Sequence, residues 1–266
     1  MMNQQGEFSF DFDGKRLAGK TILVAGGTGG LGSAVSALLA RDGANLIVGF
    51  HRNQSRAERL RRNIAETFGA EIQLVKGDIA EPAVRTRYIE KARATDGGLY
   101  GLVCLVGDPA RVKFDEVKEA DLLTSMETNY VGPVLLAREA AVEMKRIHSE
   151  GGIVLFSTMQ AVALFESSIN YAGPKSALVH AARIMAKQWG GAEGIRVNVV
   201  APGVNRAGMA LESIASGKYD FFVEEGIISR FGRAEDVARV VRLLIEPDNY
   251  LTGQVITVDG GLTLRK

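Results

Sequence analysis

Two side chains in the segment Tyr171-Ala172-Gly173-Pro174-Lys175 could act together as an acid and a base. A spacing of four places Tyr171 and Lys175 on one face of a helix. A free tyrosine has a pKa of ~10, and a nearby ammonium stabilises its phenolate and lowers that value. The pair therefore predicts proton transfer at neutral pH. Pro174 predicts that the pair lies near a helix start, where proline is tolerated.

A glycine-rich turn follows the apolar run TILVAG and precedes a stretch with helical apolar spacing. Gly26 is expected to permit a sharp turn, Gly30 to let backbone approach a pyrophosphate, and Gly32 to let the helix pack closely on the strand. A pyrophosphate would lie at the positive end of that helix. The residues predicted to bind it are Gly26, Thr28, Gly29, Gly30, Leu31 and Gly32.

The end of the next apolar run bears on which dinucleotide binds. An acidic residue there would accept hydrogen bonds from the ribose hydroxyls, as NAD requires. The sequence instead reads Gly49-Phe50-His51-Arg52, so no carboxylate would repel a 2′-phosphate and Arg52 could pair with one. NADP(H) is therefore the favoured cofactor, with His51 and Arg52 at its site, and NAD(H) is the alternative.

The elements that must position these residues alternate regularly along the chain. Short β-branched runs are separated by longer stretches with helical spacing, which predicts parallel strands joined by helices. The expected fold is α/β, a Rossmann-type doubly wound sheet of seven mainly parallel strands with helices on both faces. We expect an N-terminal extension over 1–17 and a single domain over 18–266. The segment 203–229 should project from the carboxyl end of the sixth strand, where ligands bind in such sheets. The seven runs are TILVAG, NLIVGF, EIQLVKGD, LYGLVCLVG, GIVLFST, IRVNVVAP and VITVDGG.

Composition excludes several classes of protein. The net charge of +1 gives no basic field for nucleic acid or an anionic membrane. The apolar runs are shorter than the ~20 residues that cross a bilayer. Three histidines at scattered positions predict no metal site, and the single cysteine, Cys104, suits a reducing compartment. We expect a cytoplasmic protein that acts on a small molecule.

From Leu17 to the C-terminus, the chain resembles the short-chain dehydrogenase/reductase family. The resemblance implies the strand order 3-2-1-4-5-6-7. It rests on features in the family's order: the glycine turn, Asp78, Gly107, Asn129, a hydroxyl after the fifth strand, Tyr171 with Lys175, and Pro202-Gly203.

The resemblance implies a role for each matching residue. Tyr171 would exchange a proton with the substrate oxygen, while Lys175 would bind the nicotinamide ribose and lower the pKa of the tyrosine. Asn129 would hold a water that links Lys175 to solvent, or would serve as a polar residue bonded to backbone. The remaining implied cofactor contacts are Asp78, Ile79, Gly107, Pro202, Gly203 and Val204.

The family's hydroxyl group that polarises the carbonyl lies thirteen positions before the tyrosine, which gives Thr158, with Ser157 beside it. Neighbouring residues on a strand face opposite sides, so only one of the two should reach the site. Thr158 is favoured by the family spacing.

Several positions depart from the family pattern. Cys104-Leu105-Val106 replaces the usual Asn-Asn-Ala before Gly107, and Ala25 replaces a threonine before the glycine turn. A threonine common after the proline–glycine pair falls at Ala207, and the basic residues of many NADP-binding turns are absent.

The combined prediction is a reversible, NADPH-dependent carbonyl reductase with Tyr171, Lys175, Thr158 and Asn129 as its catalytic set. The alternatives are an NAD-dependent alcohol dehydrogenase and a dinucleotide-binding regulator without turnover. The resemblance also implies a homo-oligomer, a tetramer or dimer. Substrate choice should depend on 108–114, 159–168 and 204–229.

Overall fold

The computed structural model describes residues 17–166 and 168–265, and its centre is a seven-stranded sheet. The strand order is β3-β2-β1-β4-β5-β6-β7, and all neighbouring strands pair in parallel, which confirms the predicted topology. The strands are β1 (Thr21–Ala25), β2 (Asn45–Phe50), β3 (Ile72–Lys76), β4 (Leu99–Cys104), β5 (Gly151–Phe156), β6 (Ile195–Pro202) and β7 (Val255–Val258).

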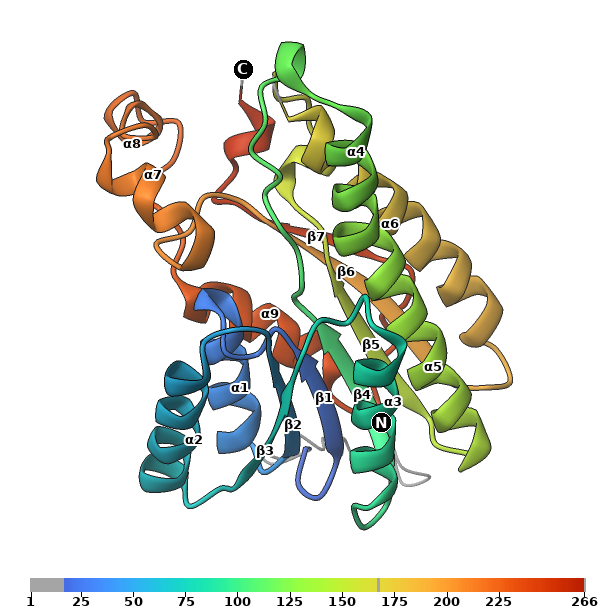
Figure 1. Cartoon of the computed structure of the whole chain (residues 1–266). Helices are drawn as coiled ribbons and strands as arrows, with labels where there is room; N and C mark the ends of the chain where they lie inside the picture. Colours follow the sequence, from blue (N-terminus) through green and yellow to red (C-terminus); the bar gives the residue numbers. More distant parts are fainter. Residues whose placement is uncertain (1–16, 167, 266) are drawn as a thin grey trace, which may run out of the picture.

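Helices cover both faces of the sheet (Figure 1). On one face lie α1 (Gly30–Arg41), α2 (Gln54–Phe68) and α9 (Ala234–Ile245). On the other lie α3 (Pro82–Arg93), α4 (Glu119–Met126), α5 (Gly132–Arg146) and α6 (Ile169–Trp189). Two short helices, α7 (Leu211–Ala215) and α8 (Phe221–Glu224), project beyond the carboxyl end of β6, as the long segment after that strand predicted.

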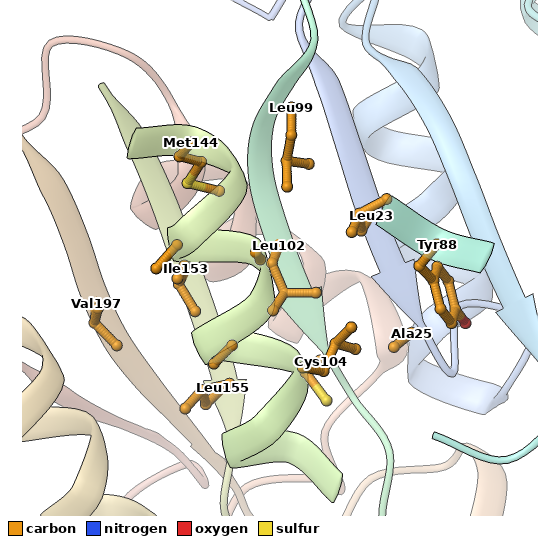
Figure 2. Packing of buried hydrophobic residues seen from close by; sticks show 14 of the residues in the cluster. Leu23, Ala25, Tyr88, Leu99, Leu102, Cys104, Met144, Ile153, Leu155 and Val197 are labelled. Carbon is orange, nitrogen blue, oxygen red and sulfur yellow. The ribbon is translucent and has the colours of Figure 1, made fainter. Parts of the chain in front are cut away.

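The central strands read as continuous apolar runs because both of their faces are covered. Every residue of β1, β4 and β5 is buried. Figure 2 shows one of the two large cores, in which Leu23, Leu102 and Ile153 from three strands meet Met144 of α5 and Tyr88 of α3. Cys104 lies in the same core, where burial raises the pKa of its thiol to about 11.

The first described residue, Leu17, is fully buried in the second core, although the sequence prediction assigned it to the extension. The rest of that extension, 1–16, lies outside the described residues. Among the described residues, no helix combines the length and apolar character needed to cross a membrane.

Candidate functional site

The predicted site residues converge on one edge of the sheet. The glycine turn follows β1, His51 and Arg52 follow β2, Asp78 follows β3, and Gly107 follows β4. Thr158 follows β5, and Pro202 ends β6. Because all these strands are parallel, their carboxyl ends meet at the same edge.

The glycine turn is held by close backbone contacts. Gly26 has φ +77°, a conformation that favours glycine, and its carbonyl accepts from the Gly29 amide at 3.0 Å. A Cβ on Gly32 would lie 2.2 Å from the Gly26 oxygen, so this position requires glycine. Helix α1 has Gly29 at its N-cap, with no side-chain cap and no acid in its first turn. Its free amides therefore suit a phosphate, and the turn fits a dinucleotide.

The residues after β2 are exposed, whereas those after β3 are partly or fully buried. His51 and Arg52 are exposed at the strand end, ahead of Asn53, whose side chain caps α2 by accepting from the Arg56 amide. Asp78 accepts from the Ala80 amide at 2.9 Å. Ile79 is 2% exposed and belongs to the core, and its carbonyl accepts from Arg85 Nη1 at 2.7 Å.

Lys175 is 2% exposed, and its ammonium is held by backbone. Nζ donates to the carbonyl oxygens of Phe156 at 2.9 Å and Val106 at 3.1 Å. Burial lowers the pKa of Lys175 to about 8, since a charged group is disfavoured in the interior. A Cβ on Gly107 would lie 2.9 Å from this Nζ. In this structure, the missing side chain of Gly107 makes room for Lys175 itself.

Tyr171 is half-buried on the same helix as Lys175. Its pKa is raised to about 12, first by burial and then by the negative charge of Asp108. This direction is opposite to the one expected from Lys175. Burial of the phenol is the main cause, and the carboxylate of Asp108 adds to it, while the Lys175 ammonium donates to two carbonyl oxygens. Sequence reasoning placed Asp108 among the specificity residues and missed this effect.

Asn129 lies in a π turn (Glu127–Val131) between α4 and α5, and it is fully buried. Its Oδ1 accepts from the Asp108 amide at 3.0 Å, and its Nδ2 donates to the Asp108 carbonyl and to Ser125 Oγ, each at 3.0 Å. A π turn changes the direction of side chains along a helix and often occurs at functional sites. The loop after β4 is thereby fixed next to Tyr171.

The position of Pro174 corrects the sequence prediction. Helix α6 begins at Ile169, so the proline is inside the helix rather than at its start. Proline has no N–H, and the carbonyl of Asn170 would therefore lack its usual donor. The hydroxyl of Ser125 donates to that carbonyl instead. Nothing in the sequence singled out Ser125, although a proline inside a helix requires some such donor.

The two hydroxyl groups after β5 have different hydrogen-bond partners. Ser157 is 4% exposed, and its Oγ donates to the Lys175 carbonyl at 3.0 Å. This hydroxyl therefore connects the end of β5 to helix α6. Thr158 Oγ1 accepts from the Gln160 amide at 3.3 Å. The threonine hydroxyl proton is therefore not committed to another group among the described residues.

Residues from two of the three segments expected to choose the substrate, 108–114 and 159–168, line a surface hollow. It has a volume of about 710 Å³, between residues 113–115, residues 160–165 and helix α6. On α6 it is lined by Ala172, Gly173 and Ser176, a face beside that of Tyr171.

At β6, the Gly203 amide donates to the Val258 carbonyl at 3.0 Å, and Val204 packs in a small separate core with Met159 and Phe231.

The comparisons with known proteins agree with this geometry. A family described as enoyl-(acyl carrier protein) reductase matches residues 25–263, a stretch that includes the glycine turn, Tyr171 and Lys175. The chain belongs to the short-chain dehydrogenase/reductase family. As a member of this oxidoreductase family, it acts on alcohol or carbonyl groups.

Relatives and solved structures in this family cover nearly the whole chain. A glucose 1-dehydrogenase from Gluconobacter oxydans is 29% identical over 251 residues, 94% of each chain. An NADPH-dependent aldehyde reductase of Arabidopsis thaliana chloroplasts is 30% identical over 263 residues, 93% of this chain and 95% of that one. A short-chain dehydrogenase/reductase structure from Mycobacterium ulcerans superposes with a TM-score of 0.86 at 27% identity, covering 94% of this chain and 92% of that chain.

Proposed function

We propose that this short-chain dehydrogenase/reductase uses NADP(H) and reduces a carbonyl to an alcohol, with Tyr171 as the general acid. The observation that carries the proposal is the pairing of a protonated tyrosine with a buried lysine beside the glycine turn. With a pKa of about 12, the phenol is protonated at neutral pH and ready to give a proton. Oxidation of an alcohol would need the phenolate instead, and the name of the aldehyde reductase relative supports the reductive direction.

The residues around the reacting oxygen have distinct parts in this reaction. When bound, the dinucleotide supplies the hydride that the carbonyl carbon receives. Tyr171 Oη gives its proton to the substrate oxygen, so a C–H and an O–H bond form as the C=O double bond becomes single. Thr158 Oγ1 donates a hydrogen bond to the same oxygen and stabilises its developing charge. Lys175, with a pKa of about 8, exchanges protons at neutral pH, and with Asn129 it restores the tyrosine proton.

The cofactor would be held along the carboxyl edge. The glycine turn and the first amides of α1 would bind the pyrophosphate. Asp78 and Ile79 would flank the adenine, and Pro202, Gly203 and Val204 would flank the nicotinamide. The exposed guanidinium of Arg52, at a strand end without an acid, would pair with the 2′-phosphate. The aldehyde reductase relative is named as NADPH-dependent, which supports the same choice.

Arg52→Ala is expected to weaken NADPH binding by about 10- to 100-fold, because a charge-assisted contact to the 2′-phosphate is lost. NADH, which lacks that phosphate, should bind the variant as it binds the wild type. Fluorescence titration of both dinucleotides measures the two effects. Arg59→Ala, which changes an exposed arginine on α2, is the matched control. Equal binding of NADH and NADPH to the wild type would contradict the preference.

Two other functions remain distinguishable by the same titration. An NAD-dependent dehydrogenase, in the direction that the name of the glucose dehydrogenase relative suggests, would bind NADH at least as well as NADPH. A regulator without turnover would bind a dinucleotide but reduce no carbonyl. The buried Lys175 and Asn129 and the uncommitted Thr158 hydroxyl favour an enzyme over a regulator.

We also propose that the chain forms a homo-oligomer, a dimer or tetramer. Apolar side chains are exposed on the helices that cover one face of the sheet, namely Leu122, Leu123 and Met126 of α4, Val142 of α5, and Ile169 and Ile184 of α6. Such an arrangement is typical of surfaces that another protein covers. Light scattering after size-exclusion chromatography should give a mass at least twice the 28.6 kDa of one chain. A mass of one chain at micromolar concentration would contradict this proposal.

A further inference from the structure

A second hollow, of about 290 Å³, lies beside the glycine turn and is not used by the catalytic residues. Its walls come from four parts of the chain: Gly30 at the start of α1, Arg56 on α2, the loop with Arg206 and Gly208, and Arg233 with Glu235 at the start of α9. Three of these side chains are arginines, and Glu235 is the one acid among the residues that line the hollow.

Two of the three arginines have no acidic partner in the part of the chain that the structure describes. Among residues 17–166 and 168–265, no carboxylate lies within ion-pair distance of Arg56 or Arg206. The guanidinium of Arg206 instead lies over the ring of Phe231, 5.3 Å from its centroid. Arg233 has a loose pair with Asp236 at 3.6 Å. Three like charges gathered around one hollow repel one another, so the arrangement favours an anion between them.

The floor of the hollow adds backbone donors to these charges. Helix α1 begins at Gly30 without a side-chain cap, which leaves amides and the positive end of a 12-residue helix facing outward. The loop after β6 reaches this point directly, because a Cβ on Gly30 would lie 2.1 Å from the Gly208 nitrogen. The loop that contains Arg206 thus contacts the N-terminal end of α1 at the glycine turn.

We propose that Arg56, Arg206 and Arg233 form a phosphate site that holds phosphate groups of the bound dinucleotide. The proposal rests on the proposed function, and it adds three residues from outside the turn and the β2 end. It also accounts for one departure from the family pattern. The turn has Thr28 and Gly29 where basic residues are common. The three guanidinium groups supply the positive charge that the turn lacks.

Two phosphate sources have this chemistry, the pyrophosphate of either dinucleotide and the 2′-phosphate of NADP(H). The test uses Arg56→Gln, Arg206→Gln and Arg233→Gln in the full chain, with Arg59→Gln as the matched control. All are exposed, so the substitutions should leave the fold intact, which thermal unfolding would verify. The dissociation constants of NADPH and NADH are measured by fluorescence titration at low and high salt.

Arg206→Gln is expected to weaken binding about tenfold, with smaller losses for the other two and none for Arg59→Gln. If the site holds the pyrophosphate, NADPH and NADH lose affinity alike. If it holds the 2′-phosphate, only NADPH does. In either case high salt should shrink the difference from the wild type, since exposed charges are screened.

The inference is overturned if the wild type binds a dinucleotide and all three variants bind it within twofold as tightly. Failure of the proposed function gives a different result, in which the wild type binds neither NADPH nor NADH. Inorganic pyrophosphate is then titrated by calorimetry into the wild type and the three variants. Weaker binding of pyrophosphate by the variants would support the proposed phosphate site. Equal binding by all four proteins, or no binding by the wild type, would contradict it.

Discussion

Tyr171→Phe is expected to lower kcat for carbonyl reduction by about 10²- to 10⁴-fold, the usual contribution of a general acid. Phenylalanine keeps the ring and its packing, so affinity for the dinucleotide and thermal stability should stay near those of the wild type. Single-turnover assays with NADPH and a carbonyl substrate measure the loss. Tyr250→Phe, which removes a hydroxyl from a fully exposed ring, is the matched control.

The pH dependence gives this prediction a second readout. Because the pKa of Tyr171 is about 12, the phenol stays protonated up to and beyond pH 9, and the reduction rate should not fall for lack of this acid. Alcohol oxidation needs the phenolate, so its rate should rise about tenfold per pH unit over the same range. Oxidation that levels off near pH 7 would show that the phenol ionises more easily than its surroundings imply.

Lys175→Met should have the second large effect, on both activity and stability. The substitution removes the amino group that would restore the proton of Tyr171. We therefore expect kcat to fall by about 10²-fold or more. It also leaves the Phe156 and Val106 carbonyls without their donor, at a cost of about 1–3 kcal/mol for each buried group. At the same time it removes a buried charge, which is stabilising.

The sign of the pH effect on stability follows from the lysine pKa. The folded value, about 8, is below the ordinary value of 10.5, so the unfolded chain binds more protons between these two pH values. Stability of the wild type therefore rises with pH through this window, relative to Lys175→Met. Urea unfolding of both proteins at pH 7, 8, 9 and 10 tests this. Above pH 10, Tyr171 lowers the stability of both proteins as pH rises, because the unfolded tyrosine loses its proton first. Parallel curves for the two proteins between pH 8 and 10 would contradict a lowered pKa of Lys175 in the folded chain.

Much of the fold was predictable because local pattern and burial agree in this chain. Each of the seven apolar runs became a strand, with ends that differ by a few residues where the run continues into a loop, as in β4 and β7. The glycine turn was also predictable, since strand, turn and helix follow one another within a dozen residues. The four-residue spacing of Tyr171 and Lys175 fixed their common face without any tertiary information.

The remaining features depend on contacts between distant segments. Gly107 is small because Lys175 and Asn129 approach it, and no local pattern carries that requirement. The pKa of Tyr171 depends first on burial and then on Asp108, which a π turn and a loop bring near it. The arginine hollow joins α2, the loop after β6 and α9, so its members are scattered along the sequence.

The hydrogen bonds around Asn129 also have a consequence for how the chain folds. Asn129 meets Asp108 across 21 positions, Ser125 meets the Asn170 carbonyl across 45, and the Asn170 side chain meets the Ala110 carbonyl across 60. Contacts at such separations form only after the loops between them have closed, which is slow. A nascent chain that ends before α6 can complete its glycine turn but not this ring of bonds. The glycine turn is thus able to form before the hydrogen bonds around Asn129.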